Sequence, residues 1–456
     1  KMAFNWELEF PQIFYDENGN KKNNNGFDIV IGNPPYVSAK LMSASGMDNQ
    51  KSFFKTEYIS AFGIFDLYVV FVEKGIKLLK TEGEFSFIIP NKFMINDYGY
   101  NLRNFLINTT QLREIRDVSK ENIFEGVSVY PIIITLTKPS EIPISYNLRG
   151  VVGLKNKLSE NLIPIELFKK LPNNIFVVNF TDAEFVILKK ILKLGKPLKQ
   201  FCKLHSGTTG FEAARTSKCI IDGKTSQKNV DFVVTGNIDR YKITLGNVRF
   251  MKKDYKKPKL ILKKHEITEG KISLFKSNKI VIGGMTKRIE AAFDNIGLGI
   301  GVSVYAATDF KTNQYYILGL LNSKLFTFYY ILINQAKHLA GDYLAINKGQ
   351  LESIPIRPME KTYEKKFPSK ISQLCQHYYE KSEKDKLLTL IDGFLDKKMS
   401  HVVDNILLNI IEKRNNPNLS GEHRELSDKL IDDIIYKLYH LSDNEINIIE
   451  KTVSHI

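Results

Sequence analysis

Residues 26–36 read Gly-Phe-Asp-Ile-Val-Ile-Gly-Asn-Pro-Pro-Tyr, and this stretch decides the fold expected for the N-terminal part of the chain. Its apolar run, 27–31, stops at Gly32, which is typical of a buried strand. The tetrapeptide 33–36 that follows would form a rigid turn, because each proline fixes its φ angle at about −65°. The sequence therefore predicts a strand that delivers a rigid, polar turn at its carboxyl end.

Further helices and strands follow this strand in alternation, the pattern of an α/β domain. The apolar spacing predicts helices at Leu67–Leu79, ended by Gly83, and at Asn101–Ile107. Three apolar or β-branched runs predict strands at Glu84–Pro90, Ile115–Val118 and Val129–Thr137. We expect a doubly wound sheet whose late pair of strands forms an antiparallel edge.

The pattern changes along the chain and predicts four regions. We place a catalytic domain at 1–145, a connection at 146–195, a mixed α+β domain at 196–358 and a helical region at 359–456. In the last region, Ser442 and Glu445 form a capping box. An apolar stripe on the preceding helix predicts packing and comprises Leu430, Ile434, Ile435 and Leu438.

The charge of the chain points to a polyanionic partner. Lys and Arg outnumber Asp and Glu by 65 to 50, which gives a net charge of +15. Such an excess suits nucleic acid, since cationic contacts to phosphates release counterions, although an AT-rich genome also produces a Lys-rich composition. Between Arg249 and Arg288 there are thirteen Lys or Arg against three acids. This excess favours a phosphate-contacting surface over a merely solvated face. The predicted DNA-binding residues are Lys252, Lys253, Lys256, Lys257, Lys263, Lys264, Lys287 and Arg288.

Several classes of protein are disfavoured. The three cysteines, Cys202, Cys219 and Cys375, form no C-x-x-C pair, which argues against a zinc site or a disulfide framework and for a reducing cytoplasm. The N-terminus lacks the apolar core of a signal peptide. The most apolar stretch, 315–333, is interrupted by polar residues near its centre and predicts a buried helix, so no membrane span is expected.

The turn Asn33-Pro34-Pro35-Tyr36 carries residues suited to methylating an exocyclic amine. Such an amine is a poor nucleophile because its lone pair is conjugated into the base. The Asn33 side-chain carbonyl and the Pro34 backbone carbonyl could accept its two hydrogens and free the lone pair for attack on a sulfonium methyl. Tyr36 offers a flat face on which a flipped base could stack. A structural turn after a strand is the alternative.

Residues 26–36 resemble the catalytic segment of amino-group DNA methyltransferases, especially the TaqI-like adenine-N6 enzymes and the type IIG restriction–modification proteins. This resemblance implies part of a Rossmann-like class I methyltransferase sheet, followed by a DNA target recognition domain. It also implies S-adenosylmethionine as cofactor and double-stranded DNA as substrate. Three later segments, 205–211, 320–325 and 351–356, resemble the opening and the close of a TaqI-like recognition domain.

The resemblance also assigns individual roles. Asn33, Pro35 and Phe71 would contact the cofactor, with Phe71, in the segment Asp66–Phe71, against its adenine ring. Phe124 would stack with Tyr36 on opposite faces of the flipped base. For Phe71 and Phe124 the alternative is an ordinary core aromatic.

The family's upstream cofactor loop is not found among the 32 residues that precede Asn33, and the Gly-rich stretch 297–301 lies in the wrong domain and is expected to be a strand or hairpin. Half of the cofactor site is therefore expected from an upstream segment or a partner subunit, which could also carry a nuclease. Two alternatives stay open. The chain could be a non-catalytic DNA-specificity module, or it could share its tetrapeptide with RNA or protein-glutamine methyltransferases.

Overall fold

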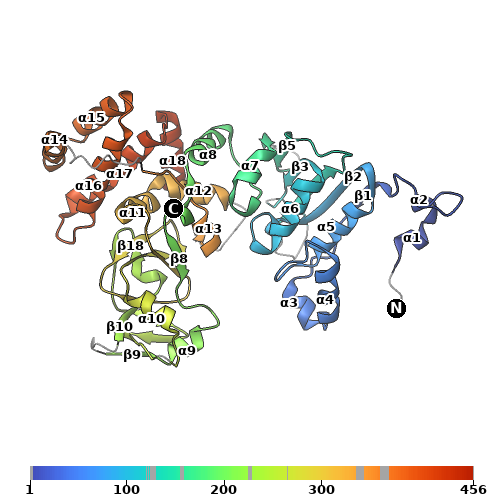
Figure 1. Cartoon of the computed structure of the whole chain (residues 1–456), viewed down its shortest axis with the longest axis horizontal. Helices are drawn as coiled ribbons and strands as arrows, with labels where there is room; N and C mark the ends of the chain where they lie inside the picture. The colour runs from blue at the N-terminus through green and yellow to red at the C-terminus, as the bar shows by residue number, and fades with distance from the viewer. Residues whose placement is uncertain are drawn as a thin grey trace. The chain divides into compact units, whose positions relative to one another are not determined.

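The computed structural model describes residues 4–119, 121, 123, 130–154, 159–223, 229–263, 265–334, 344–359 and 369–454. The chain divides into two compact units (Figure 1). The first unit is Lys1–Asp182 with Ile333–Lys337, and the second unit is Ala183–Leu332 with His338–Ile456.

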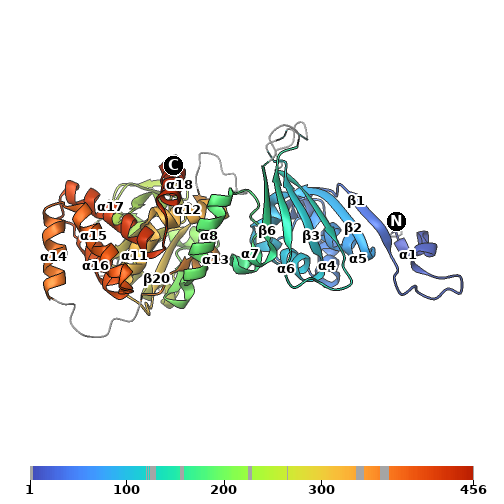
Figure 2. The ribbon, with the colours of Figure 1, turned by 90° about the horizontal axis from the view of Figure 1, so that it is seen from above.

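A six-stranded mixed sheet forms the centre of the first unit, in the order β1-β2-β4-β3-β5-β6 (Figure 2). The strands are β1 (Phe27–Gly32), β2 (Leu79–Pro90), β3 (Gln111–Asp117), β4 (Pro131–Thr137), β5 (Asn147–Val152) and β6 (Ser159–Pro164). β1 is parallel to β2 and β3 to β5, whereas the other neighbouring pairs are antiparallel. The α/β class predicted for this part of the chain is confirmed. The antiparallel strand β4 lies inside the sheet, between β2 and β3, and not at its edge as predicted.

Short helices surround this sheet. They are α1 (Trp6–Glu9), α2 (Pro11–Phe14), α3 (Ala39–Ala44), α4 (Asp48–Glu57), α5 (Tyr68–Lys77), α6 (Tyr100–Thr109) and α7 (Ile165–Lys170), with 3-10 turns η1 (Asn91–Met94), η2 (Asp97–Gly99) and η3 (Pro172–Asn174). α5 packs on β2 and α6 on β3. α5 approaches β2 closely at Gly75, where a Cβ would lie 2.7 Å from the Phe85 ring. The predicted helix 67–79 ends at Lys77, because β2 already begins at Leu79 and Gly83 lies at an irregularity within that strand.

β1 is an edge strand and is less buried than its apolar sequence predicts. Ile29 and Ile31 are 66% and 79% exposed. Among the strands that the structure describes, β1 pairs only with β2, so its other edge has no strand partner. The backbone enters β1 through Gly26, whose φ is +117° and where a Cβ would lie 2.5 Å from the Lys80 backbone nitrogen.

Residues 147–164, which the sequence analysis assigned to a connection, instead extend the sheet. β5 pairs with β3 and β6 pairs with β5. Both strands are short and largely alternate buried and exposed positions, and apart from Leu162 their exposed residues are polar. Such a half-buried pair carries few apolar residues, which is why its sequence does not stand out from a loop.

The second unit is rich in short strands, as predicted for residues 196–358. Two four-stranded sheets have the orders β19-β10-β15-β9 and β18-β16-β20-β8. Their strands are β8 (Lys203–Ser206), β9 (Ile220–Asp222), β10 (Asn229–Val233), β15 (Pro258–Ile261), β16 (Lys279–Gly283), β18 (Ala291–Asp294), β19 (Leu298–Ile300) and β20 (Val304–Thr308). Two-stranded pairs add β7 (Lys196–Pro197), β11 (Ile238–Asp239), β12 (Lys242–Ile243), β13 (Val248–Phe250), β14 (Lys253–Tyr255), β17 (Met285–Thr286), β21 (Leu344–Ala345) and β22 (Pro355–Ile356). The Gly-rich stretch 297–301 contains the buried strand β19, which confirms its reading as a strand.

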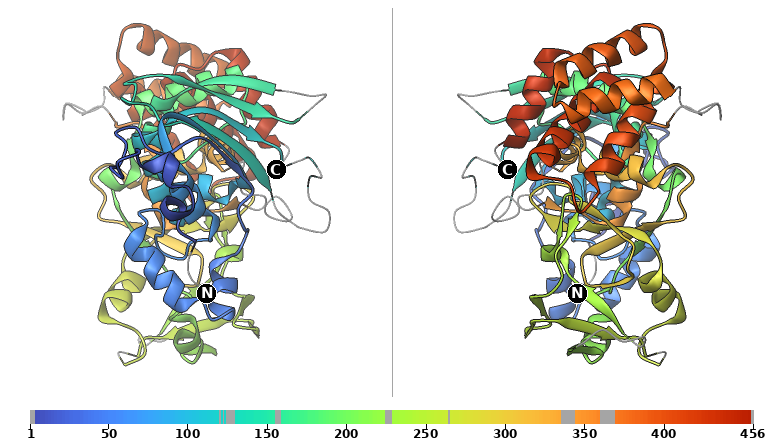
Figure 3. Two further views of the ribbon diagram at one scale, coloured as in Figure 1. Left: turned by 90° about the vertical axis from the view of Figure 1, so that its right-hand side faces the viewer. Right: turned by 90° about the vertical axis from the view of Figure 1, so that its left-hand side faces the viewer.

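Helices complete the second unit, and those after residue 369 gather in one bundle (Figure 3). They are α8 (Asp182–Leu194), α9 (Ala213–Ser217), α10 (Glu269–Lys276), α11 (Gln314–Asn322), α12 (Lys324–Ile333), α13 (Lys348–Glu352), α14 (Ser369–Glu380), α15 (Lys384–Asp396), α16 (Ser400–Arg414), α17 (Gly421–Leu438) and α18 (Asp443–Ser454), with 3-10 turns η4 (Leu198–Gln200) and η5 (Thr235–Asn237). The predicted capping box of α18 is present, since Ser442 and Glu445 exchange hydrogen bonds, and the predicted stripe on α17 is buried.

The apolar stretch 315–333 forms two helices, not one. α11 and α12 meet at Ser323 with a bend of 61°. In the part of the chain described, no single helix has the length and hydrophobicity to cross a bilayer, and this bent pair meets the criterion only when its two halves are joined. The side chains of both helices are mostly buried, as predicted for a core element.

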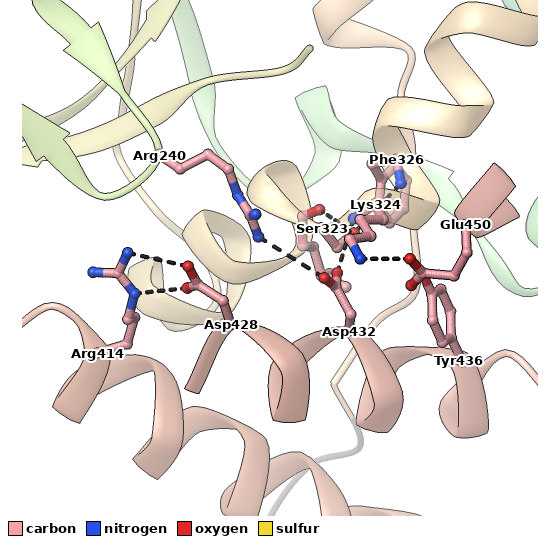
Figure 4. Close-up of polar contacts among 10 residues, drawn as sticks. Arg240, Ser323, Lys324, Phe326, Arg414, Asp428, Asp432, Tyr436 and Glu450 are labelled. Carbon is pink, nitrogen blue, oxygen red and sulfur yellow. Dashed lines mark hydrogen bonds and ion pairs between the residues drawn. The ribbon is translucent and has the colours of Figure 1, made fainter. Parts of the chain in front are cut away.

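A polar network around the buried Asp432 fastens the helical bundle to the preceding elements of the second unit (Figure 4). Asp432 of α17 accepts a hydrogen bond from the Lys324 backbone N–H at 2.8 Å and lies 4.0 Å from the Arg240 guanidinium. The Lys324 ammonium pairs with Glu450 of α18 at 2.5 Å. Burial raises the pKa of Asp432 to about 6, because its charged form loses hydration that Arg240 and Lys324 only partly replace.

The raised pKa of Asp432 predicts a pH-dependent stability. Because the unfolded carboxyl releases its proton at lower pH than the folded one, its contribution to folding is lost as pH rises from about 4 to about 6. Relative to Asp432→Asn, the native protein should lose about 3 kcal/mol of unfolding free energy over this window. Denaturant titrations at stepped pH measure the difference. The exposed Asp254→Asn variant serves as control, and parallel pH curves for native protein and Asp432→Asn would refute the assignment.

Candidate active site and nucleic-acid interface

The loop Asn33-Pro34-Pro35-Tyr36 lies directly after β1, at the carboxyl end of the parallel pair β1–β2. Asn33 and Pro35 are exposed, whereas Pro34 is buried. Among the residues that the structure describes, none donates a hydrogen bond to the Asn33 side chain or to the Pro34 carbonyl oxygen. Neither acceptor is therefore engaged by a donor from the part of the chain that the structure describes.

Tyr36 anchors the loop to the neighbouring strand. Its hydroxyl donates to the Ile88 carbonyl of β2 at 3.0 Å, and its side chain is half-buried. Burial raises the pKa of Tyr36 to about 12, so the hydroxyl stays protonated and remains a donor at neutral pH. The ring thereby has a fixed position in which one face could receive a base.

Two further contacts hold the chain that follows the loop. The Leu67 backbone N–H donates to the Val37 carbonyl at 2.9 Å. The Asp66 carboxylate accepts from the Ala39 backbone N–H at 3.2 Å. The segment that begins at Asp66 thus supports the loop directly, a role that the sequence analysis did not assign to it.

Phe71 lies on α5 and is 42% exposed. This exposure argues against the core alternative, because the buried face of α5 is formed by other residues, such as Val69, Val72 and Ile76. Its role as a cofactor contact stays a prediction. Phe124, predicted to stack on the flipped base, lies outside the described residues.

Most of the predicted DNA-binding residues are exposed on the second unit. Lys252 and Lys253 lie at the turn of the hairpin β13–β14, where Lys252 has a φ of +65°. The exposed members are Lys252, Lys253, Lys256, Lys257, Lys263 and Lys287, and none of them forms an ion pair with a residue that the structure describes. Arg288 differs, since it lies 3.5 Å from both Asp239 and Glu290. Lys264 lies outside the described residues.

Three of the other basic residues between 249 and 288 serve the fold. Lys259 pairs with Asp231 at 2.6 Å, and Lys271 donates to the carbonyls of Ser206 and Gly207. Lys279 is fully buried and pairs with Asp294 at 2.5 Å. Desolvation lowers the pKa of Lys279 while the Asp294 carboxylate opposes that shift.

The Asp294 carboxylate also organises the turn that leads into β19. It accepts hydrogen bonds from the backbone N–H groups of Ile296, Gly297 and Leu298 at 2.9–3.1 Å. The sequence analysis counted Lys279 within the basic excess without separating it from surface lysines. Its position in the apolar run Lys279–Gly283 is the signal that distinguishes it.

Two segments of the chain match known families. Residues 1–124 match the Eco57I restriction-modification methylase family, and residues 232–356 match the TaqI-like C-terminal specificity domain. The chain therefore carries a segment similar to a restriction-modification methylase, followed by a segment similar to a specificity domain. This confirms the family resemblance and the α/β methyltransferase class predicted from the sequence.

The relatives agree with these matches. A Methanocaldococcus jannaschii protein named as a candidate type II restriction enzyme and methyltransferase is 28% identical over 383 residues, which cover 77% of this chain and 28% of that protein. The Escherichia coli type II restriction enzyme and methyltransferase RM.Eco57I is 30% identical over 120 residues, 26% of this chain and 12% of that protein. The chain thus spans less than a third of the length of either relative.

Among solved structures, that of the type IIL restriction–modification enzyme MmeI in complex with DNA covers 94% of this chain and 57% of that chain. Its TM-score is 0.46 and its sequence identity 11%, a similarity too distant to assign any property to this chain.

The buried pair Lys279–Asp294 predicts which basic residues stabilise the fold. Lys279→Met leaves the Asp294 carboxylate buried without its cation and should cost about 3–5 kcal/mol of unfolding free energy. Lys279→Met combined with Asp294→Asn should recover part of that loss. Lys252→Gln, at an exposed turn, should change stability by less than about 0.5 kcal/mol. Denaturant unfolding compares the variants, and equal effects of Lys279→Met and Lys252→Gln would contradict the distinction.

Proposed function

We propose that this chain supplies the catalytic loop and the DNA-reading domain of a site-specific, S-adenosylmethionine-dependent DNA methyltransferase that methylates adenine at N6. One observation carries the proposal. The Asn33 amide and the Pro34 carbonyl are unengaged acceptors on a loop that Tyr36, Leu67 and Asp66 hold in place. Preorganised acceptors of this kind need no reordering when a substrate binds, which lowers the barrier to reaction.

In the proposed reaction, the Asn33 side-chain oxygen and the Pro34 backbone oxygen accept the two hydrogens of the adenine amino group. These hydrogen bonds draw the nitrogen lone pair out of conjugation with the ring. Tyr36 stacks on the base, which must leave the duplex to reach the loop. The Phe124 ring takes the opposite face of the base.

The cofactor is proposed to contact Asn33, Pro35 and Phe71. The exposure of all three is consistent with such a contact, since a buried side chain could not reach a bound small molecule. S-adenosylmethionine would supply an electrophilic methyl group at this position. The residues of the chain align the amino nitrogen with that methyl group and hold the base in place.

Double-stranded DNA is the proposed partner of the second unit. The exposed lysines of the β13–β14 hairpin and of residues 256–263 would contact phosphates, which position the protein without reading sequence. The specificity domain would read the base edges. We infer that the protein works in the cytoplasm, where DNA and reduced thiols coexist, consistent with the free thiols of Cys202, Cys219 and Cys375.

A further methyltransferase segment, in the same polypeptide or in a partner subunit, is proposed to cover β1. Two observations support it. The isoleucines at positions 29 and 31 leave an exposed apolar surface on β1, and the relatives are more than three times as long as the matched region. An uncovered apolar edge strand would otherwise be prone to aggregation.

The catalytic role of Asn33 predicts a separation between methylation and binding. In the full-length protein, Asn33→Ala removes one acceptor of the amino hydrogens and should lower methyl transfer to duplex DNA at least about 100-fold, as expected for a lost transition-state contact. DNA affinity should stay within about twofold, because Asn33 makes no phosphate contact in this proposal. Transfer from labelled S-adenosylmethionine measures the first quantity, and a gel-shift titration measures the second.

The same experiment separates the alternatives. Retained methylation by Asn33→Ala would refute the catalytic assignment. Inactivity of the native full-length protein, together with tight duplex binding, would identify a DNA-specificity module without catalysis. Competition between duplex DNA and RNA at matched salt tests the RNA methyltransferase alternative, which predicts that RNA displaces DNA.

The proposed phosphate contacts predict a change in salt dependence. Lys252→Gln with Lys253→Gln should weaken binding to all duplex sequences and reduce the slope of log Kobs against log[salt] by about 2, since each phosphate contact contributes about 0.9. The matched control is Lys397→Gln with Lys398→Gln, two adjacent exposed lysines after α15. If the slope of log Kobs against log[salt] for the Lys252→Gln/Lys253→Gln variant equals that of the native protein and of the control variant, the hairpin does not belong to the DNA interface.

A further inference from the structure

A chain of hydrogen bonds connects the catalytic loop to the end of β2. The Asp66 carboxylate accepts from the Ala39 N–H at 3.2 Å and, through its second oxygen, from the Tyr98 hydroxyl at 3.1 Å. The Tyr98 and Tyr68 hydroxyls are 2.9 Å apart. Tyr68 in turn accepts from the Phe93 N–H at 3.1 Å. These contacts join three segments that are distant in sequence.

The direction of every bond in this chain is fixed. A carboxylate only accepts, so Tyr98 must donate its single proton to Asp66. Tyr68 must then donate to Tyr98, because Tyr98 has no second proton to give. All four bonds therefore point toward the Asp66 carboxylate, an alignment in which each bond polarises the next.

The hydroxyls in this chain are held in their protonated form. Tyr68 is fully buried and Tyr98 is partly buried. Burial raises the pKa of both hydroxyls far above the ordinary value, and the nearby Asp66 carboxylate adds to that shift. Both tyrosine hydroxyls therefore remain hydrogen-bond donors throughout the physiological pH range.

The far end of the chain is rigid. Arg103 of α6 is fully buried and donates to the backbone carbonyls of Phe93, Asn96 and Asn173. Gly99 sits against this segment so closely that a Cβ would lie 2.1 Å from the Phe93 carbonyl oxygen. The turns η1 and η2, which carry Phe93 and Tyr98, thus form a fixed support for Asp66.

We propose that Asp66, Tyr98 and Tyr68 are positioning residues that set the catalytic loop relative to β2 for methyl transfer. This inference rests on the proposed function. The loop has one anchor at Tyr36, within the motif, and Asp66 supplies a second one at Ala39, three residues beyond the motif. The pairing of Gly32 with Phe87 holds the start of the loop and these two anchors hold its end, so the Asn33 and Pro34 oxygens keep the spacing that an amino group requires. Misplacement of a reacting group by about 1 Å can cost about 100-fold in rate.

The substitution Asp66→Asn tests the direction of the bonds and not only their number. The asparagine oxygen would still accept from Ala39, but its amide nitrogen would face Tyr98 as a donor. Tyr98 would then donate to Tyr68, whose own proton would have no acceptor within the chain of bonds. The shape of the site is kept while its hydrogen bonding is reversed.

The experiment uses the full-length protein and compares Asp66→Asn, Asp66→Ala and Tyr98→Phe. We expect kcat for methyl transfer to fall about 10-fold in Tyr98→Phe and Asp66→Asn and about 100-fold in Asp66→Ala. KM for duplex DNA and for S-adenosylmethionine should stay within about twofold. Hydrogen exchange of the Ala39 amide should become faster in Asp66→Ala, which removes the acceptor, and this reports on the loop independently of catalysis.

Tyr146→Phe is the matched control. Tyr146 lies in the same unit and is partly buried like Tyr98, and its hydroxyl accepts from the Leu112 N–H at 3.2 Å without touching the loop. It should leave kcat and Ala39 exchange unchanged. Equal losses of kcat in Tyr146→Phe and Tyr98→Phe, or a change in thermal stability or KM alone, would overturn the proposal. Should Tyr98→Phe fail to fold, Asp66→Asn carries the same test.

Asn33→Ala, measured in parallel, separates this inference from the proposed function. An active Asn33→Ala variant would refute the catalytic role of the loop. An inactive Asn33→Ala variant beside a fully active Tyr98→Phe and Asp66→Asn would leave that role intact and refute the positioning role alone.

Discussion

The parallel pairing of β1 with β2 is the constraint on which the first unit depends. It brings the carboxyl ends of two strands, far apart in sequence, to one edge of the sheet. The loop Asn33–Tyr36 leaves one strand there, and the turns η1 and η2 leave the other. The Tyr36 hydroxyl bond to Ile88 and the chain of bonds through Asp66 span this edge. Without this pairing, the loop and the turns η1 and η2 would not be held beside each other at the same edge of the sheet.

Local patterns predicted what local physics determines. The apolar run 27–31, the helix at 101–107 and the capping box at Ser442 appear where the sequence places them, because strand, helix and cap preferences act over a few residues. The exposure of Ile29 and Ile31 could not be predicted in this way, since it depends on which strands lie beside β1. The position of β4 inside the sheet is likewise a matter of long-range pairing, which periodicity does not encode.

The residues of the candidate site show the same difference between what local sequence predicts and what depends on long-range contacts. Asn33 to Tyr36 could be found from the sequence, because a rigid turn of hydrogen-bond acceptors is itself a chemical signal. Tyr98 gave no such signal, since one tyrosine in a polar turn looks like any other until the fold brings it to Asp66. Residue charge shows a similar limit: composition counted Lys252 and Lys279 alike, although one is exposed at a hairpin turn and the other is buried against Asp294.

Buried polar groups hold the parts of each unit together that must keep a fixed geometry. In the first unit, Arg103 donates to three backbone carbonyls and thereby immobilises the support beneath Tyr98. In the second, Lys279 and Asp294 fix the turn before β19, and Asp432 links α17 to α12. Apolar contacts alone would allow these elements to slide, because the hydrophobic effect is not directional. Hydrogen bonds to buried charges define one arrangement, since any displacement leaves a charged group unsatisfied at a cost of several kcal/mol. A catalytic loop that must hold two oxygens at fixed spacing requires that kind of support.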